Sequence, residues 1–221
     1  MVIVVGFLDI LFPPLCLHCR KDYREKYGLC TRCLSQVEFT GVSACIRCGR
    51  ICKGKSCAPL AHRYSRVLSV AHYLGPWRKV VQSAKFARDR TVAMELAREL
   101  ARLAKAAGFS LPQAVAPAPA ARKHWRYFDA VELVAAELAR STGAPLVKAL
   151  ARRPGRAPQV LLTRRQRLQG LEDYIYAPKN SLEGAIWLVD DVYTTGATAD
   201  ACAGALLAAG ARRVLVFVLA A

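Results

Sequence analysis

The sequence is poor in acidic residues and has no long apolar run. Lysine and arginine number 33 against 16 aspartates and glutamates, which gives a formal net charge of +17 at pH 7. This excess favours polyanionic partners such as nucleic acid or phosphorylated substrates, although an arginine-rich protein from a GC-rich genome would carry similar charge on solvated helices. No apolar stretch is long enough to cross a bilayer, which argues against an integral membrane protein.

The start of the chain does not resemble a secretory leader. Residues 1–15 are apolar, but no basic segment and no small-residue cleavage site precede the first cysteines. We expect them to form a short packing helix of a cytoplasmic protein. The chain has 221 residues, of which 54% are apolar, so it can form one globular α/β domain with a small appendage.

Cysteine is nearly absent outside one segment. Eight of the nine cysteines lie between Cys16 and Cys57. The pairs Cys16/Cys19 and Cys30/Cys33 have CxxC spacing, and ten residues separate them. Two such knuckles supply the four thiolates that tetrahedral zinc requires, and four thiolates leave no open position for catalysis. The sequence therefore predicts a structural zinc site.

A second cysteine set is less regular. Cys45 and Cys48 again form a CxxC pair, whereas four residues separate Cys52 from Cys57. We expect one or two structural Zn²⁺ ions in total, and the two sets could exchange ligands. Disulfides in a secreted protein and an iron–sulfur cluster are the alternatives. The ninth cysteine, Cys202, is expected to be a small buried side chain.

The most informative stretch runs from Ile186 to Thr198. Its first four residues are apolar and predict a buried strand of a parallel sheet. Asp190 and Asp191 follow at the carboxyl end, where open α/β sheets bind ligands. Both carboxylates could turn toward one ligand and accept hydrogen bonds from vicinal hydroxyls, directly or with a metal.

Hydroxyl residues and a glycine follow the two acids. Gly196 allows a backbone conformation in which successive N–H groups converge on an anion. A helix over 198–209, capped by Thr198 and ended by Gly210, would add its dipole and free N–H groups. The stretch predicts a sugar-phosphate site, and a solvated Asp-Asp turn is the alternative.

Strands and helices alternate through the rest of the chain, which predicts a mostly parallel sheet flanked by helices. The expected strands are 65–74, 113–116 and 213–219. The expected helices are 91–107 and 129–143, and a loop or flap is expected over 152–167. Thr91 would cap the first helix, and Asp129 with Glu132 would form a capping box for the second.

The run 186–198 resembles the phosphoribosyl-pyrophosphate (PRPP) signature of type I phosphoribosyltransferases. In that family the paired acids hold the ribose hydroxyls and the threonine–glycine loop binds the 5′-phosphate, so the resemblance implies PRPP with Mg²⁺. The implied PRPP-binding residues are Asp190, Asp191, Thr194, Thr195, Gly196, Ala197 and Thr198. The candidate pyrophosphate-binding residues are Lys85, Arg122 and Lys123.

Cysteine knuckles before this signature resemble the ComF (competence protein F) family over nearly the whole chain. The pair Lys85-Phe86 falls where that family usually has Lys-Phe. Other matching positions are 7–14, Gln159, Arg164 and Arg167, and departures are 126–130 and Gly170. The resemblance implies two domains: an N-terminal helix with zinc ribbons over 1–60, and a type I phosphoribosyltransferase-like domain over 61–221.

The family resemblance implies a role in DNA uptake and natural transformation, and a transferase whose acceptor is unknown. Thr194 stands where hypoxanthine-type salvage enzymes carry an acid, which argues against their substrate. No cysteine follows the initiator, so a glutaminase domain is not expected. A nucleotide-salvage transferase remains an alternative.

The competing class is a non-catalytic PRPP-fold module that binds single-stranded DNA through the ribbon and the basic surface. Trp77, Trp125 and Tyr127 lie beside basic residues and could stack on bases, although core packing accounts for each of them as well. DNA-uptake or recombination proteins would then be partners, and a homodimer is left open.

Overall fold

The computed structural model describes residues 14–41, 45, 48–49, 62–86, 89–120, 129–153, 175–177 and 182–221. The expected N-terminal helix lies almost wholly outside these ranges. So do several residues named above, namely Gln159, Arg164, Arg167, Gly170, Cys52, Cys57, Arg122, Lys123, Trp125 and Tyr127.

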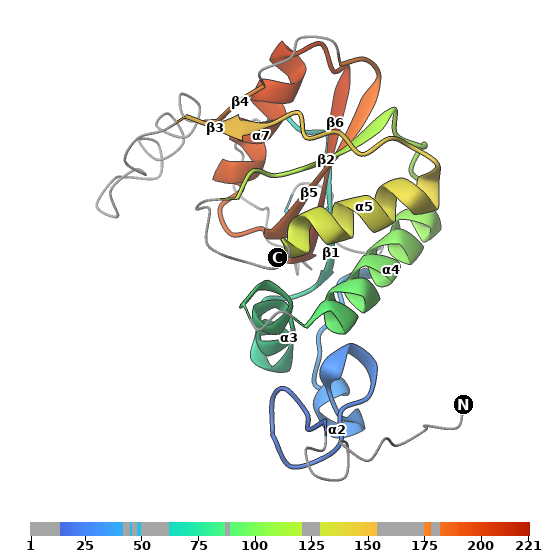
Figure 1. The fold of residues 1–221 in the computed structure, drawn as a ribbon, viewed down its shortest axis with the longest axis vertical. Helices are drawn as coiled ribbons and strands as arrows, with labels where there is room; N and C mark the ends of the chain where they lie inside the picture. Colours follow the sequence, from blue (N-terminus) through green and yellow to red (C-terminus); the bar gives the residue numbers. More distant parts are fainter. Residues whose placement is uncertain are drawn as a thin grey trace.

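A four-stranded parallel sheet forms the centre of the molecule (Figure 1). Its order is β1-β6-β5-β2. The strands are β1 (Arg66–Ala71), β2 (Ala114–Pro117), β5 (Ala185–Val192) and β6 (Arg213–Ala220). The predicted parallel sheet is confirmed. Its two central strands are almost wholly apolar because helices cover both faces.

Helices cover the two faces unequally (Figure 1). One face carries α3 (Gly75–Phe86), α4 (Arg90–Ala106) and α5 (Ala130–Thr142), and the other carries α7 (Ala197–Ala208). Consecutive residues of β5 are buried on opposite faces of the sheet. Trp187 packs with α3, α4 and α5, whereas Leu188 packs with α7. Two hydrophobic cores therefore lie on either side of the sheet.

The helix ends differ partly from the predicted ones. Asp89 rather than Thr91 caps α4, and its side chain accepts a hydrogen bond from the N–H of Val92. Asp129 caps α5 as predicted, but the Glu132 carboxylate pairs with Lys148 at 2.7 Å. Helix α3 was not among the predicted elements.

The cysteine-rich ribbon, residues 14–41, packs against α4 and α3 (Figure 1). It contains η1 (Lys26–Gly28) and the short helix α2 (Thr31–Leu34). The N–H of Tyr27 donates to Glu95 of α4 at 2.5 Å, and its ring meets the Trp77 ring edge-on at 5.2 Å. Trp77 is fully buried and donates to the carbonyl of Leu219, so core packing is its role and base stacking is excluded.

The end of the ribbon extends the sheet beyond β1. Phe39 forms an antiparallel bridge with Ala71, and the N–H of Thr40 donates to the carbonyl of Val70 at 3.0 Å. The Thr40 hydroxyl donates to the carbonyl of Ser69 at 2.6 Å. The ribbon therefore covers an edge of β1 that would otherwise expose unpaired backbone groups.

Two short antiparallel strands, β3 (Ala151–Arg152) and β4 (Ile175–Tyr176), lie over α7. Ile175 is buried in the same core as α7. Most of the predicted 152–167 loop lies outside the described residues. Among the described helices, none is long and apolar enough to span a membrane.

Candidate functional site

The paired acids lie inside β5 rather than beyond its end. The strand was expected to end at Val189, but it continues to Val192, with Asp190 opposite Val218 of β6. Side chains alternate along a strand, so Asp190 and Asp191 lie on opposite faces. Asp190 lines a hollow on the α7 side, whereas Asp191 contacts α3.

The fold disfavours the ionised form of the Asp190 side chain. Burial and the neighbouring charge of Asp191 raise the pKa of Asp190 to about 7. The N–H of Asp191 donates to its Oδ1 at 2.8 Å, and the positive charges of Lys85 and Arg152 also favour the ionised form. Asp190 can therefore gain or lose a proton near neutral pH, as groups in ligand sites often do.

Lys85 reaches the acids from the last turn of α3. Its ammonium forms an ion pair with Oδ2 of Asp191, while Oδ1 of Asp191 accepts a hydrogen bond from the N–H of Val192 at 2.7 Å. The structure thus brings Lys85, a candidate from the sequence, directly to the acidic pair. The pairing holds Asp191 on the α3 face.

The Gly196 loop, residues 193–198, connects β5 to α7. Gly196 has a φ of +79°, in the left-handed region that glycine adopts without strain. It is the N-cap of α7 and offers no side-chain cap, so the predicted cap at Thr198 is wrong and the helix begins at Ala197. The hollow beside the loop is lined by Asp190, Val192, Tyr193, Thr194, Gly196, Ala197, Thr198, Ala199 and Val218.

This hollow suits an anion attached to a polar group. A helix N-terminus without a side-chain cap presents backbone N–H donors and the positive end of the helix dipole. Thr194 and Thr198, which carry hydroxyls, line the same hollow, and so does Asp190, whose carboxylate can accept hydrogen bonds. Thr195 is close by, with its Oγ1 3.4 Å from the N–H of Ala197, but it is not among the lining residues.

Arg152 joins the site from β3, and sequence reasoning had not singled it out. Its Nε donates to the carbonyl of Pro119 at 2.8 Å, in the turn that follows β2. The N–H of Ala118 in that turn donates to the carbonyl of Val189, so the turn lies beside β5. Arg152 was one arginine among many in its segment, and only the β3–β4 pairing distinguishes it.

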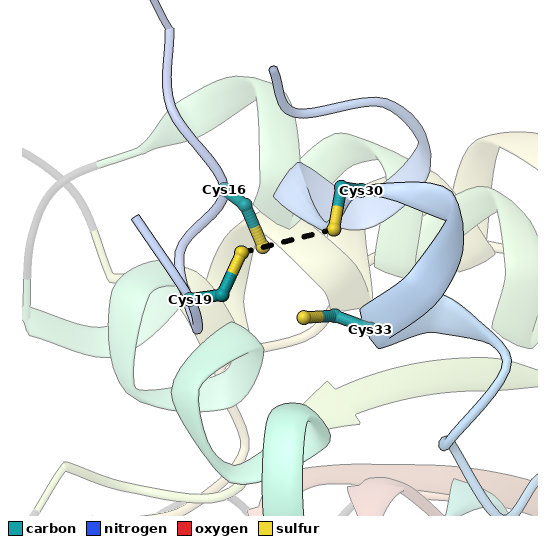
Figure 2. A group of neighbouring side chains, drawn as sticks. All are labelled: Cys16, Cys19, Cys30 and Cys33. Carbon is teal, nitrogen blue, oxygen red and sulfur yellow. Dashed lines mark hydrogen bonds between the residues drawn. The ribbon is translucent and has the colours of Figure 1, made fainter. Parts of the chain in front are cut away.

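Four cysteines of the ribbon converge as the CxxC spacing predicted (Figure 2). The sulfurs of Cys16, Cys19, Cys30 and Cys33 all lie within 4.8 Å of one another, and those of Cys19 and Cys30 are 3.8 Å apart. Zinc–sulfur bonds of about 2.3 Å in a tetrahedron place sulfurs roughly 3.8 Å apart. These residues therefore fit one structural Zn²⁺.

Backbone N–H groups prepare the first thiol of this set for a metal. Burial alone would raise the pKa of Cys16, but donation from the N–H groups of Cys19, Cys30 and His18 lowers it to about 6. Metals bind the thiolate form, so the backbone favours the binding state. The seven described cysteines are all free thiols, so no disulfide links any two of them.

The second cysteine set is described only in part. The N–H of Cys48 and that of Gly49 both donate to the carbonyl of Cys45, at 3.3 and 2.8 Å, which makes the tight turn of a knuckle. Its expected partners, Cys52 and Cys57, lie outside the described residues. A second zinc site and the sharing of ligands stay predictions.

Comparison with known proteins found a family model that matches the cysteine-rich part and solved structures that resemble part of the chain. Residues 7–63 match the family model described as a double zinc ribbon domain. The glutamine PRPP amidotransferase of B. subtilis is 25% identical over 56% of this chain, with a TM-score of 0.39. The match covers only 25% of that longer enzyme.

Two bacterial relatives match over almost the whole chain. The DNA utilization protein YhgH of Salmonella typhimurium is 31% identical across 94% of this chain and 96% of its own length. The competence protein F of Haemophilus influenzae is 26% identical across 93% of this chain and 96% of its own length. The chain therefore belongs to the ComF (competence protein F) family, with a zinc ribbon preceding an α/β domain.

Proposed function

We propose that this protein binds PRPP, or a closely related ribose phosphate, at the carboxyl end of β5. The observation that carries the proposal is that Asp190, Gly196 and the N-terminus of α7 line the same hollow. A carboxylate accepts hydrogen bonds from sugar hydroxyls, and the helix N-terminus binds a phosphate. The carboxylate and the helix N-terminus are separated in sequence only by the end of β5 and the Gly196 loop.

Each end of the ligand would meet groups of suitable charge. The Gly196 loop would hold the 5′-phosphate and Asp190 the ribose hydroxyls. Asp191 would contribute to ribose binding once the ligand competes with Lys85 for its carboxylate. Lys85 and Arg152 would face the pyrophosphate, together with Arg122 and Lys123, which lie outside the described residues.

Carboxylates and phosphate oxygens are the donors that Mg²⁺ prefers. Asp190 and Asp191 fit that preference, and Mg²⁺ would neutralise the pyrophosphate when bound. The protein itself would contribute positioning of the ribose and positive charge near the leaving group.

A transferase would use this site to displace pyrophosphate. The bond between the anomeric carbon and pyrophosphate would break, pyrophosphate would leave with the electron pair, and an acceptor nucleophile would bond to the carbon and lose a proton. The acceptor is unassigned. Pyrophosphate release with a panel of nitrogen nucleophiles would separate an enzyme, including a nucleotide-salvage enzyme, from a binding module.

Calorimetric titration with PRPP and Mg²⁺ tests the proposal. We expect binding by the wild type and its loss in the double variant Asp190→Ala/Asp191→Ala. Glu132→Ala is the matched control, since it removes one carboxylate from an exposed ion pair with Lys148. Equal affinity in the wild type and the double variant would contradict the proposed site.

The pyrophosphate end can be tested separately with neighbouring arginines. Arg152→Gln should weaken PRPP binding at least tenfold and leave ribose 5-phosphate binding unchanged. Arg153→Gln is the control, because the exposed Arg153 lies over the Tyr176 ring at 5.3 Å, away from the acids. If Arg152→Gln weakened the binding of PRPP and of ribose 5-phosphate equally, Arg152 would not be a pyrophosphate-binding residue.

We propose single-stranded DNA as a second ligand, with a role after DNA has entered the cytoplasm during natural transformation. The net charge of +17 favours it, and so does the name of the YhgH relatives, DNA utilization protein. Contacts with phosphates release counterions, so affinity should fall steeply with salt. Failure to retain labelled single strands at low salt would remove this candidate.

A further inference from the structure

The chain leaving the cysteine-rich region contacts the Gly196 loop and α7. Residues 62–64 lie just before β1, far in sequence from residues 193–204. Arg63 and Tyr64 are nevertheless hydrogen-bonded to that region at distances of 2.6 to 3.1 Å, and Nδ1 of His62 lies 4.0 Å from Oδ1 of Asp200. None of these three residues was predicted to belong to the site.

Arg63 fixes the first turn of α7. Its backbone N–H donates to Oδ1 of Asp200 at 2.7 Å, and its guanidinium donates to Oδ2 at 3.1 Å from Nε and 2.8 Å from a terminal nitrogen. The Asp200 side chain is only 10% exposed, so these charge-assisted bonds are shielded from solvent. Gly204 leaves room for the guanidinium, because a Cβ there would lie 2.8 Å from Cζ of Arg63.

Tyr64 fixes the start of the loop itself. Its hydroxyl lies 2.6 Å from the hydroxyl of Tyr193, and both residues are buried. Burial, then the bond to Tyr193, raise the pKa of Tyr64, so its hydroxyl stays protonated. Gly196 packs on this pair: a Cβ there would collide with the Tyr193 hydroxyl and come within 3.0 Å of that of Tyr64.

The cysteine-rich region adjoins the same cluster. The His62 ring stacks on the Tyr64 ring at 4.7 Å, and buried Cys48 belongs to the core that contains Tyr64 and Tyr193. Gly49 approaches β1 closely, since a Cβ there would lie 2.9 Å from Val67. The second cysteine knuckle and the Gly196 loop thus share one packed core.

We infer that Arg63 and Tyr64 are positioning residues that hold the Gly196 loop, through Asp200 and Tyr193, in the conformation that binds the phosphate of a sugar phosphate. The inference rests on the proposed function and extends it. It makes phosphate affinity depend on a segment outside the PRPP signature. That segment follows the second cysteine set in the sequence.

A double-mutant cycle on the two tyrosines tests the inference. Tyr64→Phe and Tyr193→Phe each keep the ring and remove one hydroxyl. We expect each to weaken ribose 5-phosphate binding about fivefold, as for one lost hydrogen bond. The double variant should be no weaker than either single one, because both remove the same bond.

The readouts separate positioning from general damage. Inorganic pyrophosphate should bind all the variants as it binds the wild type, because its expected contacts are Lys85 and Arg152. Arg63→Gln should likewise weaken ribose 5-phosphate alone, and Tyr23→Phe, at an exposed tyrosine of the ribbon, should change neither affinity. Parallel losses of both ligands, unchanged single variants, or losses that multiply to about 25-fold in the double variant would overturn the inference.

Failure of the proposed function would be distinguishable. A wild type that binds neither PRPP nor ribose 5-phosphate contradicts the proposed function and the inference together. A wild type that binds both, with tyrosine variants that bind equally well, contradicts the inference alone.

Discussion

Asp190 gains a proton more readily in the folded protein than in the unfolded chain. Its pKa is about 7 in the fold, against roughly 3.9 for an exposed aspartate. Between those values the folded state holds a proton that the unfolded state has lost. Stability therefore falls as pH rises from about 4 to about 7 and then levels off.

Asp190→Asn should remove this decline. Because Asp190 is partly exposed, we expect the variant to gain on the order of 2 kcal/mol relative to the wild type between pH 5 and pH 8, and to lose ribose binding. Urea unfolding of both proteins at the two pH values measures the difference. A difference that does not change with pH would contradict the raised pKa.

The sequence predicted that the two acids lie near the carboxyl end of a buried strand, because a short apolar run before polar residues has few other interpretations. It did not show which face each carboxylate would occupy, since that depends on whether the strand ends at Val189 or continues to Val192. The partner of Asp191 was also hidden: Lys85 lies on a helix more than a hundred residues earlier, and only packing brings the two together.

At the scale of elements, Gly196 sets how β5 turns into α7. Gly196→Ala should destabilise the protein by more than the roughly 1–2 kcal/mol of left-handed strain, because the new methyl group collides with Tyr193. It should also abolish phosphate binding. Thermal unfolding and titration with ribose 5-phosphate measure the two effects.

Gly143 provides the matched control for that substitution. Its φ is +71°, but a Cβ there would meet no atom within 4 Å. Gly143→Ala should therefore show the backbone strain alone, and ligand binding should stay unchanged. Equal effects of the two substitutions would mean that the Tyr193 contact is unimportant.

Helices with regular apolar spacing and clear ends were predicted within a few residues, as α4 and α5 show. Helix α3 was overlooked although Pro76 stands in its first turn, a common helix start. Its apolar residues Trp77, Val80, Val81 and Ala84 follow helical spacing, but only three residues separate it from the strand β1, so the two patterns run together in the sequence. The pairing of β3 with β4 depends on contacts distant in sequence, and no local pattern reveals it.

At the scale of the whole molecule, zinc should stabilise the ribbon and, through it, the sheet. Elemental analysis should find about two zinc ions per chain, or one if only Cys16, Cys19, Cys30 and Cys33 bind. Cys33→Ser should lower the zinc content by about one and lower the melting temperature. Removal of the ribbon's support would also bare the edge of β1 and promote aggregation.

Cys202→Ala is the control for the zinc experiment. Cys202 is buried in α7, and burial raises the pKa of its thiol, so it is a packing residue as the sequence suggested. The zinc content of the Cys202→Ala variant should equal that of the wild type. A metal content near zero in wild-type protein purified without chelator would count against the zinc site.

The order of the strands also has a consequence for synthesis on the ribosome. β1 is complete at Ala71, but its neighbour in the sheet, β6, begins only at Arg213. At translation rates of about 5–20 residues per second, this interval lasts on the order of ten seconds. Of the neighbours of β1 in the described part of the chain, the ribbon segment around Thr40 is already synthesised during that interval, so the ribbon can shield a nascent strand long before the sheet closes.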